Sequence, residues 1–131
     1  MFNKKIILLI VLSLFLIGCR TSPVVDISGA PLNTASGKAP SVTTVKNKIV
    51  QAGIQLGWQM KKVKPGLIVA TLNLRKHMVM VDINYSNKAY SINYKDSNNM
   101  GYDGKNIHAN YNSWVQNLSK AINSQVYNSE N

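Results

Sequence analysis

The chain has 131 residues, with 15 Lys and Arg against 5 Asp and Glu, and a single cysteine. This length fits one domain with a modest core, and one cysteine excludes an intrachain disulfide. The formal net charge of +10 favours anionic surroundings, which include nucleic acid, anionic lipid head groups and cell-wall carboxylates.

The first nineteen residues follow the order of a secretory signal. Lys4 and Lys5 precede an apolar segment, 6–17, which ends in Gly18 and Cys19. A bilayer-spanning helix needs about 20 apolar residues, so this segment has the length of a signal-peptide core instead. Residues 16–19 resemble a bacterial lipobox, in which the bond before the cysteine is cut and the new terminal cysteine receives acyl chains (diacylglycerol and palmitate). We expect residues 1–18 to be a lipoprotein signal peptide and Cys19 to carry the membrane anchor.

The residue after the cysteine indicates in which membrane the protein is expected to reside. In lipoproteins of double-membraned bacteria, an aspartate at that position is the usual signal for retention in the inner membrane. This chain has Arg20 there, so the resemblance implies the outer membrane, with the domain facing the periplasm. Export also removes nucleic acid as a partner and leaves anionic envelope components. The oligomeric state stays open.

Residues 19–40 are rich in Ser, Thr, Pro, Gly and Ala. This composition predicts a lipidated flexible tether, in which only residues 24–27 have the character of a short edge strand. Ser41 then fits the N-cap of an amphipathic helix, and Gly57 fits its stop signal. The apolar stripe of that helix comprises Val42, Val45, Ile49, Ala52 and Leu56.

After Gly57 the apolar period changes to two, which predicts an antiparallel meander of four strands at 58–63, 67–74, 77–85 and 89–95. Pro65 and Gly66 occupy the positions that a type II turn requires. Because alternate side chains point to opposite faces, one face is expected to be apolar and the other polar. The expected core face holds Trp58, Met60, Ile68, Ala70, Leu72, Leu74, Val79, Val81, Ile83, Tyr90, Ile92 and Tyr94.

The segment 96–106 is rich in Asn, Gly, Asp and Ser and is expected to be a loop. A second amphipathic helix follows, with an apolar stripe from Ile107 to Ile122 that includes Trp114 as a core residue, and the last residues, 127–131, are expected to fray. The sequence therefore predicts one α+β domain at 41–126. Its order is helix, four-stranded antiparallel meander, helix, with both helices packed on one face of the sheet.

Side chains that could carry catalysis or hold a metal are sparse. His77 and His108 lie about thirty residues apart and have no partner at metal-ligand spacing, so a zinc site would need an accidental convergence in space. Residues 96–101 resemble half of a calcium loop, but Met100 occupies a ligand position and Ile107 stands where the bidentate glutamate belongs. We expect no metal, no cofactor and no enzymatic activity, and a hydrolase is only a remote alternative.

Residues 49–122 resemble an uncharacterised family of small bacterial lipoproteins. The resemblance implies the α+β fold and the envelope address, and it brings no known activity and no functional residues. The features that carry it are Ala52, Gly57-Trp58, Pro65-Gly66, Ile68-Val69-Ala70, Leu72, Arg75, His77, Val81, Ile83, Tyr85, Tyr90-Ser91-Ile92, Tyr94, Asp96-Ser97, Tyr102, Ile107, Tyr111-Asn112 and Trp114 to Leu118.

We therefore expect a membrane-anchored, non-enzymatic envelope lipoprotein that binds or scaffolds another envelope component. Its candidate binding surface comprises Lys61, Asp82 and Lys95 on the open sheet face and Tyr102 in the loop; Asp82 is also placed to pair with Lys61 or Lys95. The alternative is a binding module for anionic glycans or lipids. The observation behind this alternative is the group of basic residues Lys61, Lys62, Lys64, Arg75, Lys76 and Lys95.

Overall fold

The computed structural model describes residues 20–129. The predicted signal peptide and Cys19 lie outside the described residues, as do the last two residues of the chain. In chain order, the elements are β1 (Thr21–Pro23), β2 (Ile27–Pro31), α2 (Val42–Gln55), β3 (Gln59–Lys64), β4 (Leu67–Leu74), β5 (His77–Tyr85), β6 (Ala89–Asn98), β7 (Asn106–His108) and α3 (Asn110–Tyr127).

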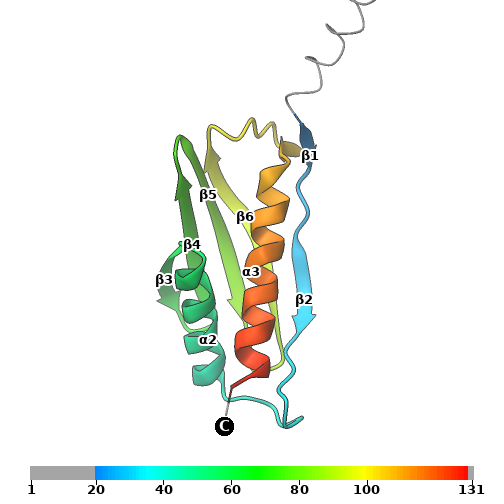
Figure 1. Ribbon diagram of the computed structural model, residues 1–131, viewed down its shortest axis with the longest axis vertical. Helices are drawn as coiled ribbons and strands as arrows, with labels where there is room; N and C mark the ends of the chain where they lie inside the picture. The colour runs from blue at the N-terminus through cyan, green and yellow to red at the C-terminus, as the bar shows by residue number, and fades with distance from the viewer. Residues whose placement is uncertain (1–19, 130–131) are drawn as a thin grey trace, which may run out of the picture.

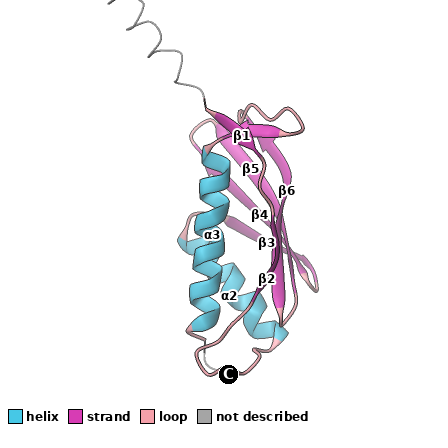
Figure 2. Ribbon diagram, turned by 90° about the vertical axis from the view of Figure 1, so that its right-hand side faces the viewer, coloured by secondary structure: helices cyan, strands magenta, loops and turns pink. Residues whose placement is uncertain are grey.

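The molecule has two layers, a sheet and a pair of helices (Figures 1 and 2). The sheet is antiparallel with strand order β2-β6-β5-β4-β3, and both helices pack on one of its faces, while β1 and β7 form a separate two-stranded ladder. The α+β class and the four sequential strands β3 to β6 agree with the prediction. The fifth strand, β2, shares only Ile27 with the short edge strand expected at residues 24–27.

Residues 20–31, expected to belong to a flexible tether, form strands instead. In β2, Ile27 pairs with Ile92 and Ala30 with Tyr90, so this segment supplies backbone partners to the edge of β6 that would otherwise lie open. A register shift accompanies the positive φ of Gly29, +59°, and such a β-bulge is one way in which edge strands avoid further pairing. The described residues 20–31 are therefore part of the folded domain.

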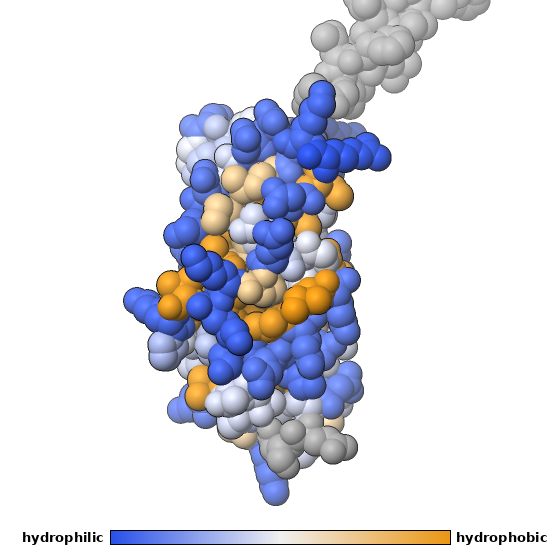
Figure 3. All heavy atoms as spheres, turned by 90° about the vertical axis from the view of Figure 1, so that its left-hand side faces the viewer, coloured by the Kyte–Doolittle hydropathy of each residue, from blue (hydrophilic) through white to orange (hydrophobic). Residues whose placement is uncertain are grey.

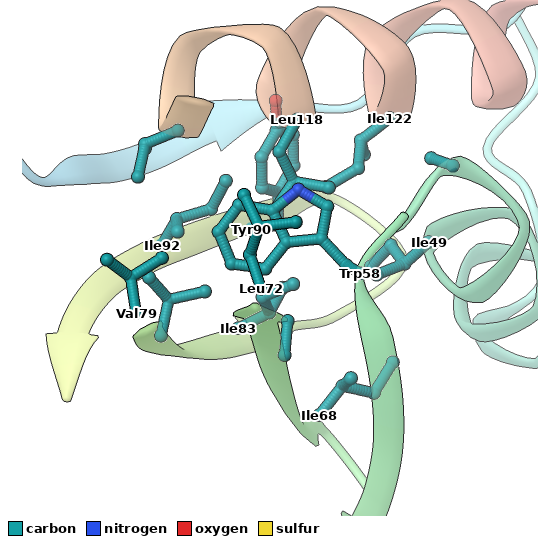
Figure 4. Close-up of a cluster of buried hydrophobic side chains, with 14 of the residues drawn as sticks. Ile49, Trp58, Ile68, Leu72, Val79, Ile83, Tyr90, Ile92, Leu118 and Ile122 are labelled. Carbon is teal, nitrogen blue, oxygen red and sulfur yellow. The ribbon is translucent and has the colours of Figure 1, made fainter. Parts of the chain in front are cut away.

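Helix α2 begins and ends as its sequence predicts. The Thr44 N–H donates to the Ser41 Oγ at 3.0 Å, which caps the amino end. At the other end, the N–H groups of Gly57 and Trp58 donate to the carbonyls of Ile54 and Gly53, and Gly57 has φ +86°. This Schellman ending turns the chain into β3 and places Trp58 in the core (Figure 4).

The core lies between the sheet and the helices. The alternating pattern placed most of its residues correctly, because Ile68, Val79, Val81, Ile83 and Ile92 are fully buried. Figure 4 shows Trp58, Leu72 and Tyr90 gathered under Leu118 and Ile122 of α3. The exceptions are Leu74, which is 47% exposed at the end of β4, and Met60 and Tyr94, which are half-buried.

Helix α3 differs from the prediction at both ends. It begins at Asn110, after Ile107 has paired in β7, and its N-cap is Ala109, which makes no side-chain cap bond. Its last residue is Tyr127, whose carbonyl accepts the Ala35 N–H at 2.9 Å. The expected fraying therefore does not begin at residue 127. Trp114 is half-buried against the core rather than inside it.

Strand β6 continues to Asn98, so the loop is shorter than the expected 96–106. The register shifts between the pairs Val81–Tyr94 and Met80–Asp96, which leaves Lys95 as the extra residue of a bulge. The open face of the sheet also holds Val69, which is only 8% exposed although no helix covers it.

Candidate functional site

Three of the four predicted binding residues lie on the open sheet face, but the structure pairs two of them with each other. Lys95 Nζ lies 3.5 Å from Asp82 Oδ1, the pairing that the sequence suggested as an alternative to binding. The contact is an ion pair without hydrogen-bond geometry. Such half-exposed pairs typically stabilise a fold by about 0 to 1 kcal/mol. Lys61 lies two strands from Asp82, with Val69 between them in the register.

The fourth residue, Tyr102, stacks on Tyr94, with 4.1 Å between ring centroids and 30° between ring planes. Tyr102 and Lys95 also line one shallow polar hollow of about 360 Å³, formed by residues 94–102. The structure thus brings Tyr102 and Lys95 together at the hollow. It does not bring Lys61 there.

Two buried tyrosines have opposite environments. The Tyr90 hydroxyl lies 2.6 Å from Ser119 Oγ and donates to Asn123 Oδ1 at 2.7 Å. The Tyr111 hydroxyl has no hydrogen-bond partner among the described residues, although its side chain is fully buried. Burial raises the pKa of Tyr111 well above its ordinary value, and the nearby Asp26 charge raises it further. Burial also raises the pKa of Tyr90, so neither hydroxyl ionises near neutral pH.

The two histidines converge in space, with ring centroids 5.9 Å apart. His77 Nδ1 donates to the Asn99 carbonyl at 2.7 Å, since a carbonyl oxygen only accepts, and His108 Nδ1 accepts the Asn110 N–H at 3.1 Å. Each ring therefore holds backbone at one end of the sheet. Within residues 20–129, no three His, Cys, Asp or Glu side chains lie close enough together to hold a metal ion.

Charge is distributed very unevenly along the chain. Residues 27–81 contain eight basic residues and no Asp or Glu. This range covers α2, β3 and β4, which lie side by side at one edge of the molecule (Figure 1). Five exposed large apolar side chains belong to the same elements or their ends: Val42, Ile54, Leu56, Val63 and Leu74. Figure 3 shows apolar patches among basic and polar residues on this side.

An open groove of about 430 Å³ lies between the first turn of α2 and the β3–β4 hairpin, and we call it the α2–β3 groove. Val42 and Val63 contribute exposed apolar surface, at 51% and 48% exposure. Gly66 adopts the predicted positive φ, +84°, so the hairpin turns tightly beside Tyr85. The lining residues are Val42, Thr43, Lys46, Lys62, Val63, Lys64, Pro65, Gly66 and Tyr85.

This groove combines apolar walls with three ammonium groups, Lys46, Lys62 and Lys64. Apolar surface removed from water contributes roughly 25 cal/mol per Å², and the lysines attract acidic groups and repel basic ones. The sequence did not reveal the groove, because Val42 fits the core stripe of the helix, and the basic group recognised in the sequence includes Lys62 and Lys64 of the hairpin but not Lys46 of the helix. The signal that could have found it is the long stretch without acidic residues.

Comparison of the chain with profiles of known protein families, with curated proteins and with solved structures finds no match. The resemblance to small bacterial lipoproteins therefore stays a prediction. In the part of the chain that the structure describes, neither helix is both long enough and apolar enough to cross a membrane.

Proposed function

We propose that the protein is a non-enzymatic envelope lipoprotein that binds another envelope component through the α2–β3 groove. The acylated Cys19 anchors it in the outer membrane, and the domain faces the periplasm. The observation that supports this proposal best is the groove, which joins exposed valines to three lysines in a region without acidic side chains. This chemistry fits a partner that presents acidic and apolar side chains together.

The partner's backbone can pair with the edge strand that lies beside the groove. Strand β3 lies at the edge of the sheet, so its outer backbone groups are not used in the ladder with β4. An extended segment can add to such an edge, while pockets beside it select side chains. Lys61, Lys62 and Lys64 on β3 disfavour pairing with a second copy of the same cationic strand. We therefore infer an acidic, extended protein segment as the occupant.

The alternative function, binding of anionic glycans, is favoured by the hollow at residues 94–102. There the half-exposed Tyr102 presents its ring beside Lys95, and exposed aromatic rings are common platforms for sugars. A hydrolase is disfavoured, because the carboxylates of the folded domain have structural uses. Asp82 pairs with Lys95, Asp26 accepts the Tyr94 N–H, and Asp103 accepts backbone N–H groups within its own loop.

The test is site-specific photocrosslinking in intact cells. A photoreactive residue replaces Val63 in the groove, and the control replaces Asn117, which is exposed on α3. We expect a protease-sensitive adduct from the Val63 position alone. The adduct should disappear in the variant Lys46→Glu/Lys62→Glu/Lys64→Glu and persist in Lys38→Glu/Lys88→Glu/Lys120→Glu, which changes the net charge equally.

Three results would contradict the proposal. Equal adducts from both positions would show that contact is non-specific. An adduct that survives the groove variant as well as the control variant would show that the lysines do not contribute. A protease-resistant adduct at position 63 that loses mass on glycan digestion would show that the groove binds a glycan and not a protein segment.

A further inference from the structure

One end of the molecule gathers chain segments that are distant in sequence, and we call it the anchor end: residues 20, 74–76 and 99–105. The Arg20 carbonyl accepts the Ala109 N–H at 3.1 Å, and the Val24 N–H donates to the Lys105 carbonyl at 3.0 Å. Asn99 Nδ2 donates to the Lys76 carbonyl at 2.8 Å, which joins the 99–105 loop to the β4–β5 turn. Figure 1 shows β1, that turn and that loop at the same end of the long axis.

No spacer separates this end from the proposed anchor. Cys19 is covalently joined to Arg20, which already bonds to the domain, and β1 begins at Thr21. Because one extended residue spans at most about 3.6 Å, acylation of Cys19 brings the anchor end to within a few ångströms of the head groups. The flexible tether expected from the sequence would have allowed several nanometres.

The surface chemistry of the anchor end matches an anionic bilayer. Its residues include four basic side chains, Arg20, Arg75, Lys76 and Lys105, against the single acidic Asp103. The backbone N–H groups of Asn106 and Lys105 hold the pKa of Asp103 below its ordinary value, so that carboxylate is a genuine counter-charge. Two large apolar side chains are also exposed there, Leu74 at 47% and Tyr102 at 41%.

We propose that the anchor end rests on the head groups of anionic phospholipids, with Arg20, Arg75, Lys76 and Lys105 as the electrostatic contacts and Leu74 and Tyr102 at the interface. The inference rests on the proposed lipid anchor. Basic residues next to a lipid anchor supply the second signal that strengthens membrane attachment. Each contributes roughly fivefold to association with an anionic surface at low ionic strength.

This orientation has a consequence for the α2–β3 groove. Strand β4 runs from Leu67, beside the groove, to Leu74 at the anchor end. Eight strand residues span roughly 25 Å. The groove is therefore held well clear of the head groups, where a periplasmic partner can reach it.

The experiment uses the full-length acylated protein in vesicles, with an environment-sensitive fluorophore on an introduced cysteine. Acylation consumes the Cys19 thiol, so Leu74→Cys offers one reactive thiol at the anchor end. The control, Ala35→Cys, lies at the opposite end, because Ala35 bonds to Tyr127 at the far terminus of α3. We expect the probe at position 74 to shift to shorter emission wavelength in phosphatidylcholine mixed with phosphatidylglycerol, and less so in phosphatidylcholine alone.

The same shift should be lost at high salt and in Arg75→Glu/Lys76→Glu/Lys105→Glu, but kept in Lys38→Glu/Lys88→Glu/Lys120→Glu. The probe at position 35 should not shift. If the protein floats with the vesicles but both probes behave alike, the proposed orientation is wrong. Flotation would in that case still support the lipid anchor. Protein that does not float, or that takes up two fluorophores, would overturn the anchor and the orientation with it.

Discussion

Tyr111 and Tyr90 show that equal burial does not imply an equal contribution to stability. Both side chains are almost completely buried, but only the Tyr90 hydroxyl has hydrogen-bond partners among the described residues. Burial of a hydroxyl without a hydrogen-bond partner lowers the free energy of unfolding. Removal of a bonded hydroxyl also lowers it, because the former partners stay buried without a hydrogen bond.

We predict that Tyr111→Phe raises the free energy of unfolding by about 1 kcal/mol, and that Tyr90→Phe lowers it by about 1 to 3 kcal/mol. The pKa of Tyr111 is raised in the folded state. Above about pH 10, Tyr111 therefore ionises more readily in the unfolded chain than in the folded one, and the free energy of unfolding falls. Tyr111→Phe should therefore also reduce the loss of stability in alkali. Urea unfolding at neutral and alkaline pH measures both effects. Destabilisation by Tyr111→Phe at neutral pH would mean that its hydroxyl is bonded.

Arg75 adopts a conformation that favours glycine. It has φ +58° in the two-residue turn between β4 and β5. The left-handed region costs a residue with a Cβ roughly 1 to 2 kcal/mol, and glycine's extra backbone entropy recovers only part of that.

We predict that Arg75→Gly raises the free energy of unfolding by about 0.5 to 1 kcal/mol. Lys76→Gly is the matched control, because Lys76 does not have a positive φ, and it should lower stability. Thermal unfolding distinguishes the two. If both substitutions lower stability alike, the turn has a different geometry in solution. An arginine kept at this position despite its backbone cost agrees with the head-group contact proposed for it.

At the scale of elements, helix α2 lies close to β3 at Gly53, which faces the Met60 side chain. A Cβ at this position would overlap the Met60 side chain, including Cγ at 2.8 Å, so rotation of the outer part of that side chain does not clear it. Glycine in a helix usually loses about 1 kcal/mol relative to alanine. At position 53, the steric overlap with Met60 outweighs the gain in helix propensity that alanine would bring.

We predict that Gly53→Ala destabilises the domain by about 1 to 3 kcal/mol, as overpacking does. In the background Met60→Ala, the same substitution should be neutral or stabilising, because the overlapping atoms are gone. A double-mutant cycle by urea unfolding measures this coupling. Additive effects of the two substitutions would show that Met60 is not the obstacle.

The sequence predicted those elements whose residues repeat with a clear period. The alternation in β4 and β5, the Ser41 cap and the Gly57 stop each have a local cause, and each appears where expected. The edge strand expected at 24–27 overlaps β2 only at Ile27, because β2 is stabilised by pairing with the edge of β6, while its own Ser28, Gly29 and Pro31 resemble a linker. Long-range pairing of this kind leaves no local signature.

The candidate site was predicted only in part, for a related reason. Alternation placed Lys61, Asp82 and Lys95 on one face, but it could not show that a bulge would bring Lys95 to Asp82. Tyr102 lies in a loop without a period, and its stacking on Tyr94 depends on the tertiary path of that loop. The groove joins α2 to a hairpin about twenty residues away, which spacing alone does not reveal.

At the scale of the whole molecule, the two ends of the sheet carry different chemistry. The anchor end offers four basic residues at the end where the proposed lipid attachment joins the domain, and the α2–β3 groove lies at the other end of β4. A lipid-anchored binding protein needs this separation, because the contacts that fix it to the bilayer must leave its ligand site accessible. This division of roles between the two ends depends on acylation of Cys19.

Mass spectrometry of the protein purified from native membranes tests this dependence most directly. We predict an amino-terminal peptide that begins at Cys19 and carries fatty acyl chains, and a Cys19→Ser variant that keeps residues 1–18 and carries none. A wild-type protein without fatty acid, or a Cys19→Ser variant that matures and fractionates unchanged, would contradict the lipid anchor and the envelope address that follows from it.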